Sequence, residues 1–207
     1  MKRKETRSAL RILLPVGLGT CLSLIGDASL YAVLPTHTAA AGVSMGTVGI
    51  LLSANRVVRV FLNGPTGAAY GRYSRRRLFV LALFVGALST AIYGVSRGFW
   101  PLLVGRLVWG LAWAGIWIGG NTIVAEIGRR DERGRWVGLY QAFFYLGVSG
   151  GPIVGGLLTD GIGYHGAMGV AAGLTLIGAL IALTSLPEVD GTEPVATARR
   201  GGLRRSI

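Results

Sequence analysis

The sequence predicts an all-α membrane protein, a bundle of six transmembrane helices, on three observations. Of its 207 residues, 51% are hydrophobic and only 14% are charged, with a mean hydropathy of +0.55. A soluble domain of this size needs a more charged surface. Six apolar runs are each long enough to cross a bilayer, which takes about 20 residues. The basic residues gather mostly between these runs, and the 34 glycines suit helices that pack closely in lipid.

Six spans follow one another along the chain. The first, 12–34, comes after a basic segment, and the second, 47–70, leads into an arginine cluster. The third, 78–95, and the fourth, 100–124, flank Arg97, and the fourth is rich in tryptophan. The fifth, 137–158, is rich in glycine, and the sixth, 166–186, ends at Pro187. We therefore expect a cytoplasmic N-terminus over 1–11, a six-helix bundle over 12–186 and a flexible cytoplasmic tail over 187–207.

The distribution of lysine and arginine predicts the orientation of the spans. Four segments on one side of a six-span chain are basic, whereas the opposite side carries only Arg97. Basic connections stay in the cytoplasm, so both termini are expected there, in a multi-pass protein of the cell membrane. The net charge of +12 is then a topology signal and does not indicate a nucleic-acid site. The four segments contain Lys2, Arg3, Lys4, Arg7 and Arg11; Arg72, Arg75, Arg76 and Arg77; Arg129, Arg130, Arg133 and Arg135; and Arg199, Arg200, Arg204 and Arg205.

Three local patterns carry a family resemblance. Residues 67–77 read Gly-Ala-Ala-Tyr-Gly-Arg-Tyr-Ser-Arg-Arg-Arg, with Gly67, Arg72 and Arg76 at key positions. The fourth span contains Arg106-Leu-Val-Trp-Gly and is followed by Glu126, six residues, Arg133 and a glycine. The fifth span contains Gly-Val-Ser-Gly-Gly-Pro-Ile-Val-Gly-Gly, in which the defining residues are Gly147, Gly151, Pro152, Gly155 and Gly156.

These patterns resemble the major facilitator superfamily. The first is similar to its Gly-x-x-x-Asp-Arg-x-Gly-x-Arg-Arg loop, with Gly71 in place of the acid and Ser74 in place of the second glycine. The fifth-span pattern matches Gly-x-x-x-Gly-Pro-x-x-Gly-Gly, which is typical of drug/proton antiporters. The resemblance implies the N-terminal six-helix half of a proton-coupled exporter of drug-like or other small amphipathic molecules. It also implies conformational roles for the motif residues, with Glu126 binding basic residues of the neighbouring connection.

Charged side chains inside the spans are candidates for proton coupling, because a charge at membrane depth is costly unless it is paired or wet. Asp27 and Arg56 differ in depth by only about 3 Å at 1.5 Å per residue, so they are expected to pair. Two interpretations stay open, a proton-carrying Asp27 and a permanent structural ion pair. Arg106 matches the family's helix-4 arginine, which the resemblance implicates in coupling.

Cavity candidates lie on three spans and next to Asp27. Arg56, Arg59 and Asn63 share one face of the second span, which suits an anionic cargo or a structural role. Indoles recur every four residues on the fourth span and favour flat or cationic molecules or, equally, simple packing. The full set is Tyr31, Arg56, Arg59, Asn63, Trp109, Trp113, Trp117, Asn121 and Gln141.

Other function classes stay open beside export. The chain covers only half of the usual family protein, so a transport-dead half or an assembly partner is the main alternative, and a second six-helix bundle of the same or another chain is the expected partner. Sugar or metabolite cargo fits the same residues. Ser149 in Gly-x-Ser-x-Gly suggests an intramembrane serine protease, but His165, the only downstream histidine, is expected in an outer loop. We expect no enzyme activity, metal or cofactor, and a proton gradient as the energy source.

Overall fold

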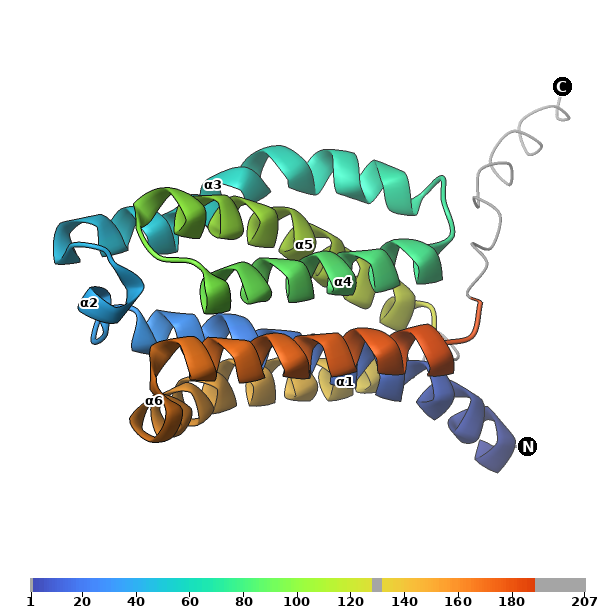
Figure 1. The fold of residues 1–207 in the computed structure, drawn as a ribbon. Helices are drawn as coiled ribbons and strands as arrows, with labels where there is room; N and C mark the ends of the chain where they lie inside the picture. The colour runs from blue at the N-terminus through green and yellow to red at the C-terminus, as the bar shows by residue number, and fades with distance from the viewer. Residues whose placement is uncertain (1, 128–131, 189–207) are drawn as a thin grey trace, which may run out of the picture.

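The computed structural model describes residues 2–127 and 132–188, and within these the chain is helical with short connections. The elements are α1 (Lys2–Val33), α2 (Thr38–Ala41), α3 (Met45–Tyr70), α4 (Arg75–Val95), α5 (Phe99–Ala125) and α6 (Arg133–Ser185). Figure 1 shows the long helices lying side by side, with α2 at the opposite end of the bundle from the N-terminus. The predicted tail from residue 189 on and residues 128–131 lie outside the described residues.

Six passes are present, although two of the predicted spans belong to one element. Five helices in the described part are long and apolar enough to cross a membrane, and the last of these is the 53-residue α6. α6 leaves helical geometry at Gly163 (φ 74°, ψ 173°) and folds back there, so its two arms are the fifth and sixth spans (Figure 1). That backbone conformation is open essentially to glycine alone. The predicted connection over 159–165 is therefore reduced to a single residue.

The first helix begins earlier than predicted. α1 starts at Lys2 rather than at residue 12, because residues 2–11 contain neither glycine nor proline and are rich in good helix formers. Its candidate span begins only at Ser8. The short α2 was also not predicted; it ends at Gly42, which adopts a left-handed conformation, and the Gly98 N–H binds the Ala41 carbonyl oxygen at 2.8 Å.

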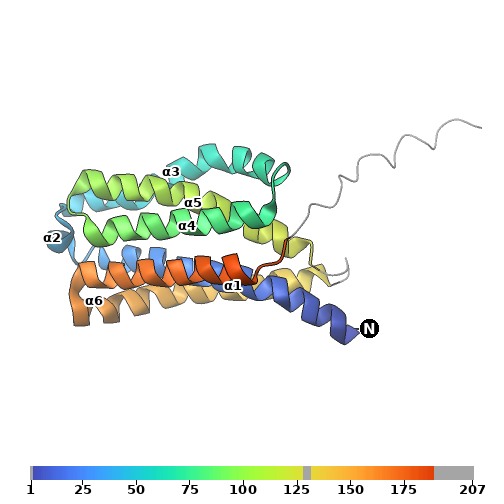
Figure 2. The ribbon, with the colours of Figure 1, turned by 45° about the vertical axis from the view of Figure 1, so that its right-hand side comes forward.

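Tight helix packing places α1 against both arms of α6. A Cβ atom added at Gly147 would lie 2.6 Å from the Cys21 carbonyl oxygen, and one at Gly151 would lie 2.5 Å from Ala28 Cβ. Gly178 in the second arm similarly faces Gly19. The predicted flat face of the fifth span is thus where α1 packs, as expected for small residues in lipid. Figure 2 shows α1 beside both arms of α6.

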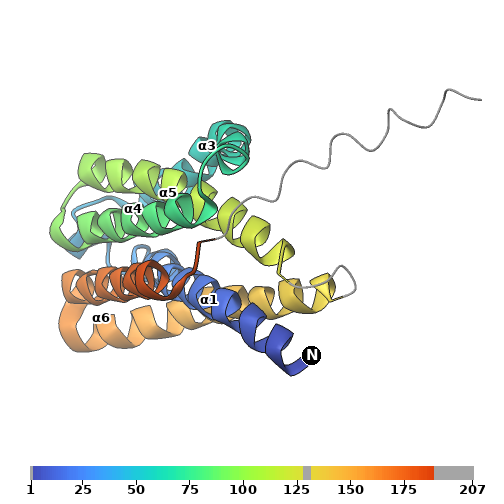
Figure 3. The same ribbon diagram turned by 90° about the vertical axis from the view of Figure 1, so that its right-hand side faces the viewer.

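The third helix is the least covered of the long helices. α3 packs on α5, where a Cβ atom at Gly110 would meet Val58 Cβ at 2.8 Å. Much of its remaining surface is open and carries large apolar side chains, with Phe61 72% exposed and Val60 76% exposed. Figure 3 shows α3 at the edge of the bundle, away from α6. The bundle is therefore open on the side between α3 and the first arm of α6. Polar residues that face inward on this side can be reached from outside the bundle.

Candidate functional site

A buried ion pair joins the first and fourth spans. Arg106 Nη1 of α5 donates to Asp27 Oδ1 of α1 at 2.5 Å, and the two side chains are 1% and 11% exposed. The expected pair between Asp27 and Arg56 is therefore wrong. Arg106 lies at a similar depth in the membrane to Asp27 and Arg56. The packing of α5 places the Arg106 guanidinium group, rather than that of Arg56, beside the Asp27 carboxylate. A fully buried arginine is stable at this depth only because it has a counter-ion and further acceptors.

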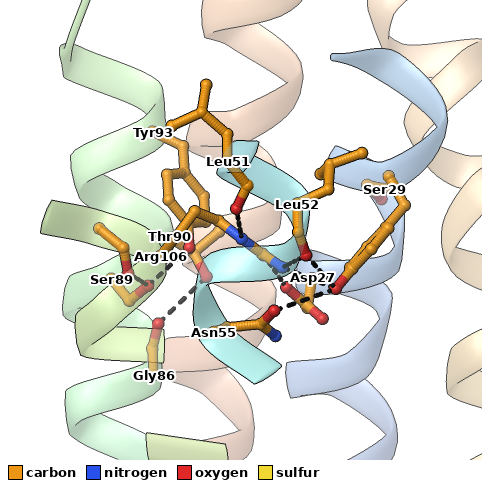
Figure 4. A network of polar contacts seen from close by, with 12 residues as sticks. Asp27, Ser29, Leu51, Leu52, Asn55, Gly86, Ser89, Thr90, Tyr93 and Arg106 are labelled. Carbon is orange, nitrogen blue, oxygen red and sulfur yellow. Dashed lines mark hydrogen bonds and ion pairs between the residues drawn. The ribbon is translucent and has the colours of Figure 1, made fainter. Parts of the chain in front are cut away.

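The other donors of Arg106 hold the third helix in the same network. Nε donates to the Leu51 carbonyl oxygen at 3.2 Å, and Nη2 donates to the Leu52 carbonyl oxygen at 3.4 Å. Figure 4 shows the guanidinium group between these carbonyls and Asp27. Nη2 also donates to Tyr31 Oη at 2.7 Å, and the guanidinium carbon lies 4.8 Å from the Tyr31 ring centroid. One side chain thus connects α1, α3 and α5.

Asn55 belongs to this network, although it is not among the predicted cavity residues. Its side chain is buried, and Tyr31 Oη donates to Asn55 Oδ1 at 3.3 Å and to the Leu52 carbonyl oxygen at 3.1 Å. The signal was present in the sequence, since an amide next to Arg56 in an apolar span is itself a polar group at membrane depth. Tyr31 is placed beside the ion pair as expected.

A cavity of about 220 Å³ opens beside the ion pair. Asp27, Tyr31 and Asn55 reach its wall from the network, so the carboxylate is accessible from the cavity. Arg56 and Arg59 of α3 line one side, and Phe144 and Val148 of α6 contribute to another. The remaining lining residues are Leu24 and the three tryptophans of α5, Trp109, Trp113 and Trp117.

The three indoles form a continuous stack along α5. The ring centroids of Trp109 and Trp113 are 6.3 Å apart, and those of Trp113 and Trp117 are 5.8 Å apart. Phe144 packs against Trp117 at 5.1 Å, and the Arg59 guanidinium carbon lies 5.7 Å from the Trp113 centroid. The cavity is therefore lined by aromatic rings and by arginines that meet at Trp113, which suits a planar apolar body with a polar group.

Three predicted cavity residues lie outside its wall. Asn63 is exposed further along α3. Gln141 Nε2 donates to Asn121 Oδ1 at 3.4 Å, and Asn121 Nδ2 donates to the Trp117 carbonyl oxygen at 2.8 Å. These two amides pair one turn beyond the aromatic stack because α5 and the first arm of α6 approach each other there. A role in binding cargo stays a prediction for all of the cavity residues.

The glycine-proline motif is divided between a packed face and an open face. Gly155 packs on Ser29 of α1, whose Oγ donates to the Gly151 carbonyl oxygen at 2.8 Å. Gly156 has open space where a Cβ would be, and Pro152, one turn before it on the same open face, is exposed. A close helix pair on one side and a missing backbone N–H at Pro152 make this arm of α6 a candidate for bending.

Contacts at the end of the bundle that carries Arg72, Arg75, Arg76, Arg77 and Arg133, here called the basic end, join separate helices. Arg75 forms an ion pair with Glu126, so the acid does bind a basic residue of the neighbouring connection. Arg76 donates to the carbonyl oxygens of Leu183 at 2.5 Å and Leu186 at 2.6 Å, and to Glu188 at 3.0 Å. Gly67, Arg72 and Arg133 are exposed there. A conformational role of these motif residues stays a prediction.

The hydrolase pattern does not assemble a nucleophile. Ser149 is exposed on the first arm of α6, whereas His165 lies in the second arm rather than in a loop. His165 Nδ1 donates to the Gly94 carbonyl oxygen at 2.9 Å, and its Nε2 accepts from Arg97 Nε at 3.2 Å. Both ring nitrogens are therefore engaged away from Ser149. Among the described residues, no group of three or more His, Cys, Asp or Glu side chains is placed to hold a metal ion.

Comparison with known proteins identifies relatives over most of the chain. The family model described as Major Facilitator Superfamily matches residues 16–206. The chain is 30% identical to a probable 4-methylmuconolactone transporter of Cupriavidus pinatubonensis over 84% of this chain and 40% of that protein. It is 32% identical to the class G tetracycline resistance protein of Vibrio anguillarum over 87% of this chain and 45% of that protein. It is 27% identical to the class B tetracycline resistance protein of Escherichia coli over 84% of this chain and 43% of that protein. The chain thus spans less than half the length of these relatives.

Proposed function

This chain belongs to the major facilitator superfamily, a family of transporters rather than enzymes, and from that premise we propose that it forms one wall of a proton-coupled exporter of small amphipathic molecules. The observation that carries the proposal is the buried Asp27–Arg106 pair at the wall of an aromatic cavity. A titratable acid, its counter-ion and a cargo-sized space meet there within a membrane span. Two tetracycline resistance proteins among the relatives favour export.

Asp27 is the proposed proton carrier. Protonation removes its negative charge, so Arg106 keeps only neutral acceptors, the Leu51 and Leu52 carbonyls and the Tyr31 hydroxyl. These acceptors belong to α1 and α3, and the network therefore favours one arrangement of these helices when charged and another when protonated. A proton drives such a change only through its different affinity for the two arrangements.

Alternating access requires a second six-helix bundle opposite the cavity. The chain covers 40–45% of the length of the three relatives compared above, and Val148, an apolar residue of the cavity lining on the first arm of α6, is exposed. We propose that a second six-helix bundle covers this open side of the cavity. In this proposal the chain lies in the plasma membrane, and its basic end faces the cytoplasm. The proton gradient supplies the energy, and no cofactor takes part.

Everted membrane vesicles test this function directly. An acid-inside gradient is generated, and aromatic compounds that are cationic, neutral or anionic are added one at a time to vesicles containing this chain. A cargo that exchanges for protons dissipates the gradient and accumulates inside, and an uncoupler abolishes the accumulation. Asp27→Asn is expected to lose uphill accumulation yet to allow downhill equilibration of the cargo. Asp160→Asn, which changes an exposed acid of α6, is the matched control and should transport normally.

The alternative is a half that assembles without transporting. The length of the relatives favours it, since one bundle supplies only one wall of the cavity. Activity of the chain alone would exclude this alternative. Inactivity that is relieved by co-expressing a C-terminal bundle would support a half-transporter, and uphill transport that survives Asp27→Asn would refute proton coupling at Asp27.

A further inference from the structure

The charges around the cavity do not balance. Arg56 and Arg59 line it and Arg106 lies behind Asp27, and among the described residues Asp27 is the only acid of the lining. Arg106 already occupies that carboxylate at 2.5 Å. In the described part of the chain no carboxylate forms an ion pair with Arg56 or Arg59, so two positive charges remain at the wall.

Arg56 and Arg59 are held toward the cavity by the geometry of α3. They are three residues apart and so share one face of the helix. Arg59 is half-buried, with its guanidinium carbon 5.7 Å from the Trp113 ring centroid, and this contact holds the charge beside the aromatic stack. Arg56 is more exposed and lines the same cavity. Cations at membrane depth without counter-ions are costly, and an anion in the cavity removes that cost.

The aromatic part of the lining selects for a flat apolar body. Trp117 and Phe144 are both half-buried, and their ring centroids are 5.1 Å apart. Aromatic faces of this kind bind a planar ring by stacking or edge contacts. The cavity volume of about 220 Å³ on this bundle accommodates a small ring system.

We propose that the cavity takes an organic anion, a carboxylate attached to a small planar apolar body. The carboxylate binds Arg56 and Arg59, which present the forked donors that suit its two oxygens. The ring lies against Trp117 and Phe144. This inference deepens the proposed function and rests on it, because it assumes that the cavity holds the cargo. It excludes a preference for cationic aromatic compounds, which the positive charges of Arg56 and Arg59 repel.

Equilibrium binding to the purified full chain in detergent tests the charge preference without transport. Three probes share one ring system, 2-naphthoate, neutral 2-naphthamide and cationic 2-naphthylmethylammonium, and compete with radiolabelled 2-naphthoate. We expect naphthoate to bind about 10-fold or more tightly than either other probe. Arg56→Gln and Arg59→Gln should each weaken naphthoate binding by about 10-fold, the loss of a charge-assisted contact. Arg11→Gln, which changes an exposed arginine of α1 outside the cavity, is the matched control and should have no effect.

Ionic quenching of tryptophan fluorescence provides a second readout that needs no cargo. In a Trp100→Phe background, which removes the exposed indole, the ratio of the iodide to the caesium quenching constant should be higher for the half-buried Trp117 than for N-acetyltryptophanamide free in solution. Arg56→Gln combined with Arg59→Gln should abolish that difference. Absence of naphthoate binding, equal affinity for the three probes, or a quenching ratio no higher than that of the free compound would overturn the inference. The proposed function is tested separately, by the vesicle assay, and is refuted if no cargo of any charge dissipates the proton gradient there.

Discussion

Removing the charge of Asp27 is the sharpest test of the buried network. Asp27→Asn keeps the size of the side chain but leaves Arg106, 1% exposed at its side chain, without its counter-ion. The reverse change, Arg106→Gln, leaves a carboxylate that is 11% exposed and lines a cavity with Arg56 and Arg59. The two changes break the same contact, but they leave charges in different surroundings.

The expected losses of stability differ for that reason. Breaking a buried ion pair from one side costs about 3–5 kcal/mol, because the remaining charge is uncompensated. Asp27→Asn should show this full loss, since the neutral acceptors of Arg106 do not replace a charge. Arg106→Gln should cost less, about 1–3 kcal/mol, because the carboxylate gains the nearby arginines and cavity water. The double change leaves no buried charge and should be less destabilised than the sum of the single changes.

Reversible unfolding measures these differences. The purified chain in mild detergent is titrated with sodium dodecyl sulfate and followed by far-ultraviolet circular dichroism, with Asp160→Asn as the control for an exposed acid. A double-mutant cycle gives the coupling energy of the pair. A stability of Asp27→Asn within about 1 kcal/mol of the unmodified chain, or purely additive losses in the double change, would refute the description of this contact as a buried ion pair.

Three further predictions concern other contacts. Gly155→Ala should destabilise the bundle by about 1–3 kcal/mol, because the new Cβ would lie 2.6 Å from Ser29 Cβ. Gly156→Ala should be neutral or stabilising, because a Cβ there meets open space, and the same unfolding assay compares the two variants. Gly163→Ala should cost about 1–3 kcal/mol, since its φ of 74° with ψ of 173° is essentially restricted to glycine, and a loss similar to that of Gly161→Ala would contradict this. Hydrogen bonds from Ser74 and Arg76 hold the pKa of Glu188 below its ordinary value. The contact is therefore complete at a pH above the ordinary pKa and is lost as the pH falls through the lowered pKa. An NMR titration should show that the pKa of Glu188 rises in Arg76→Gln.

Much of the architecture could be predicted from the sequence, because lipid allows few alternatives. A span must be an apolar helix of about 20 residues, so hydropathy alone located all six passes. The repeated glycines at 147, 151 and 155 indicated a close helix contact, and α1 does pack there. The start of α1 and the reversal at Gly163 were missed, because good helix formers extend the helix beyond the apolar run and a single glycine can reverse the chain.

The partner of Asp27 was decided by the tertiary structure. Counting residues from a helix end gives depth in the membrane, and Asp27, Arg56 and Arg106 all lie at similar depths. Depth says nothing about which helix is adjacent or how each is rotated, and the packing of α1, α3 and α5 selected Arg106. That selection in turn left Arg56 and Arg59 at the cavity without an ion pair among the described residues. The sequence by itself determined which residues are costly to bury, whereas the helix packing determined which of those charges neutralise each other, because ion pairing depends on distances of a few ångströms that only the assembled bundle sets.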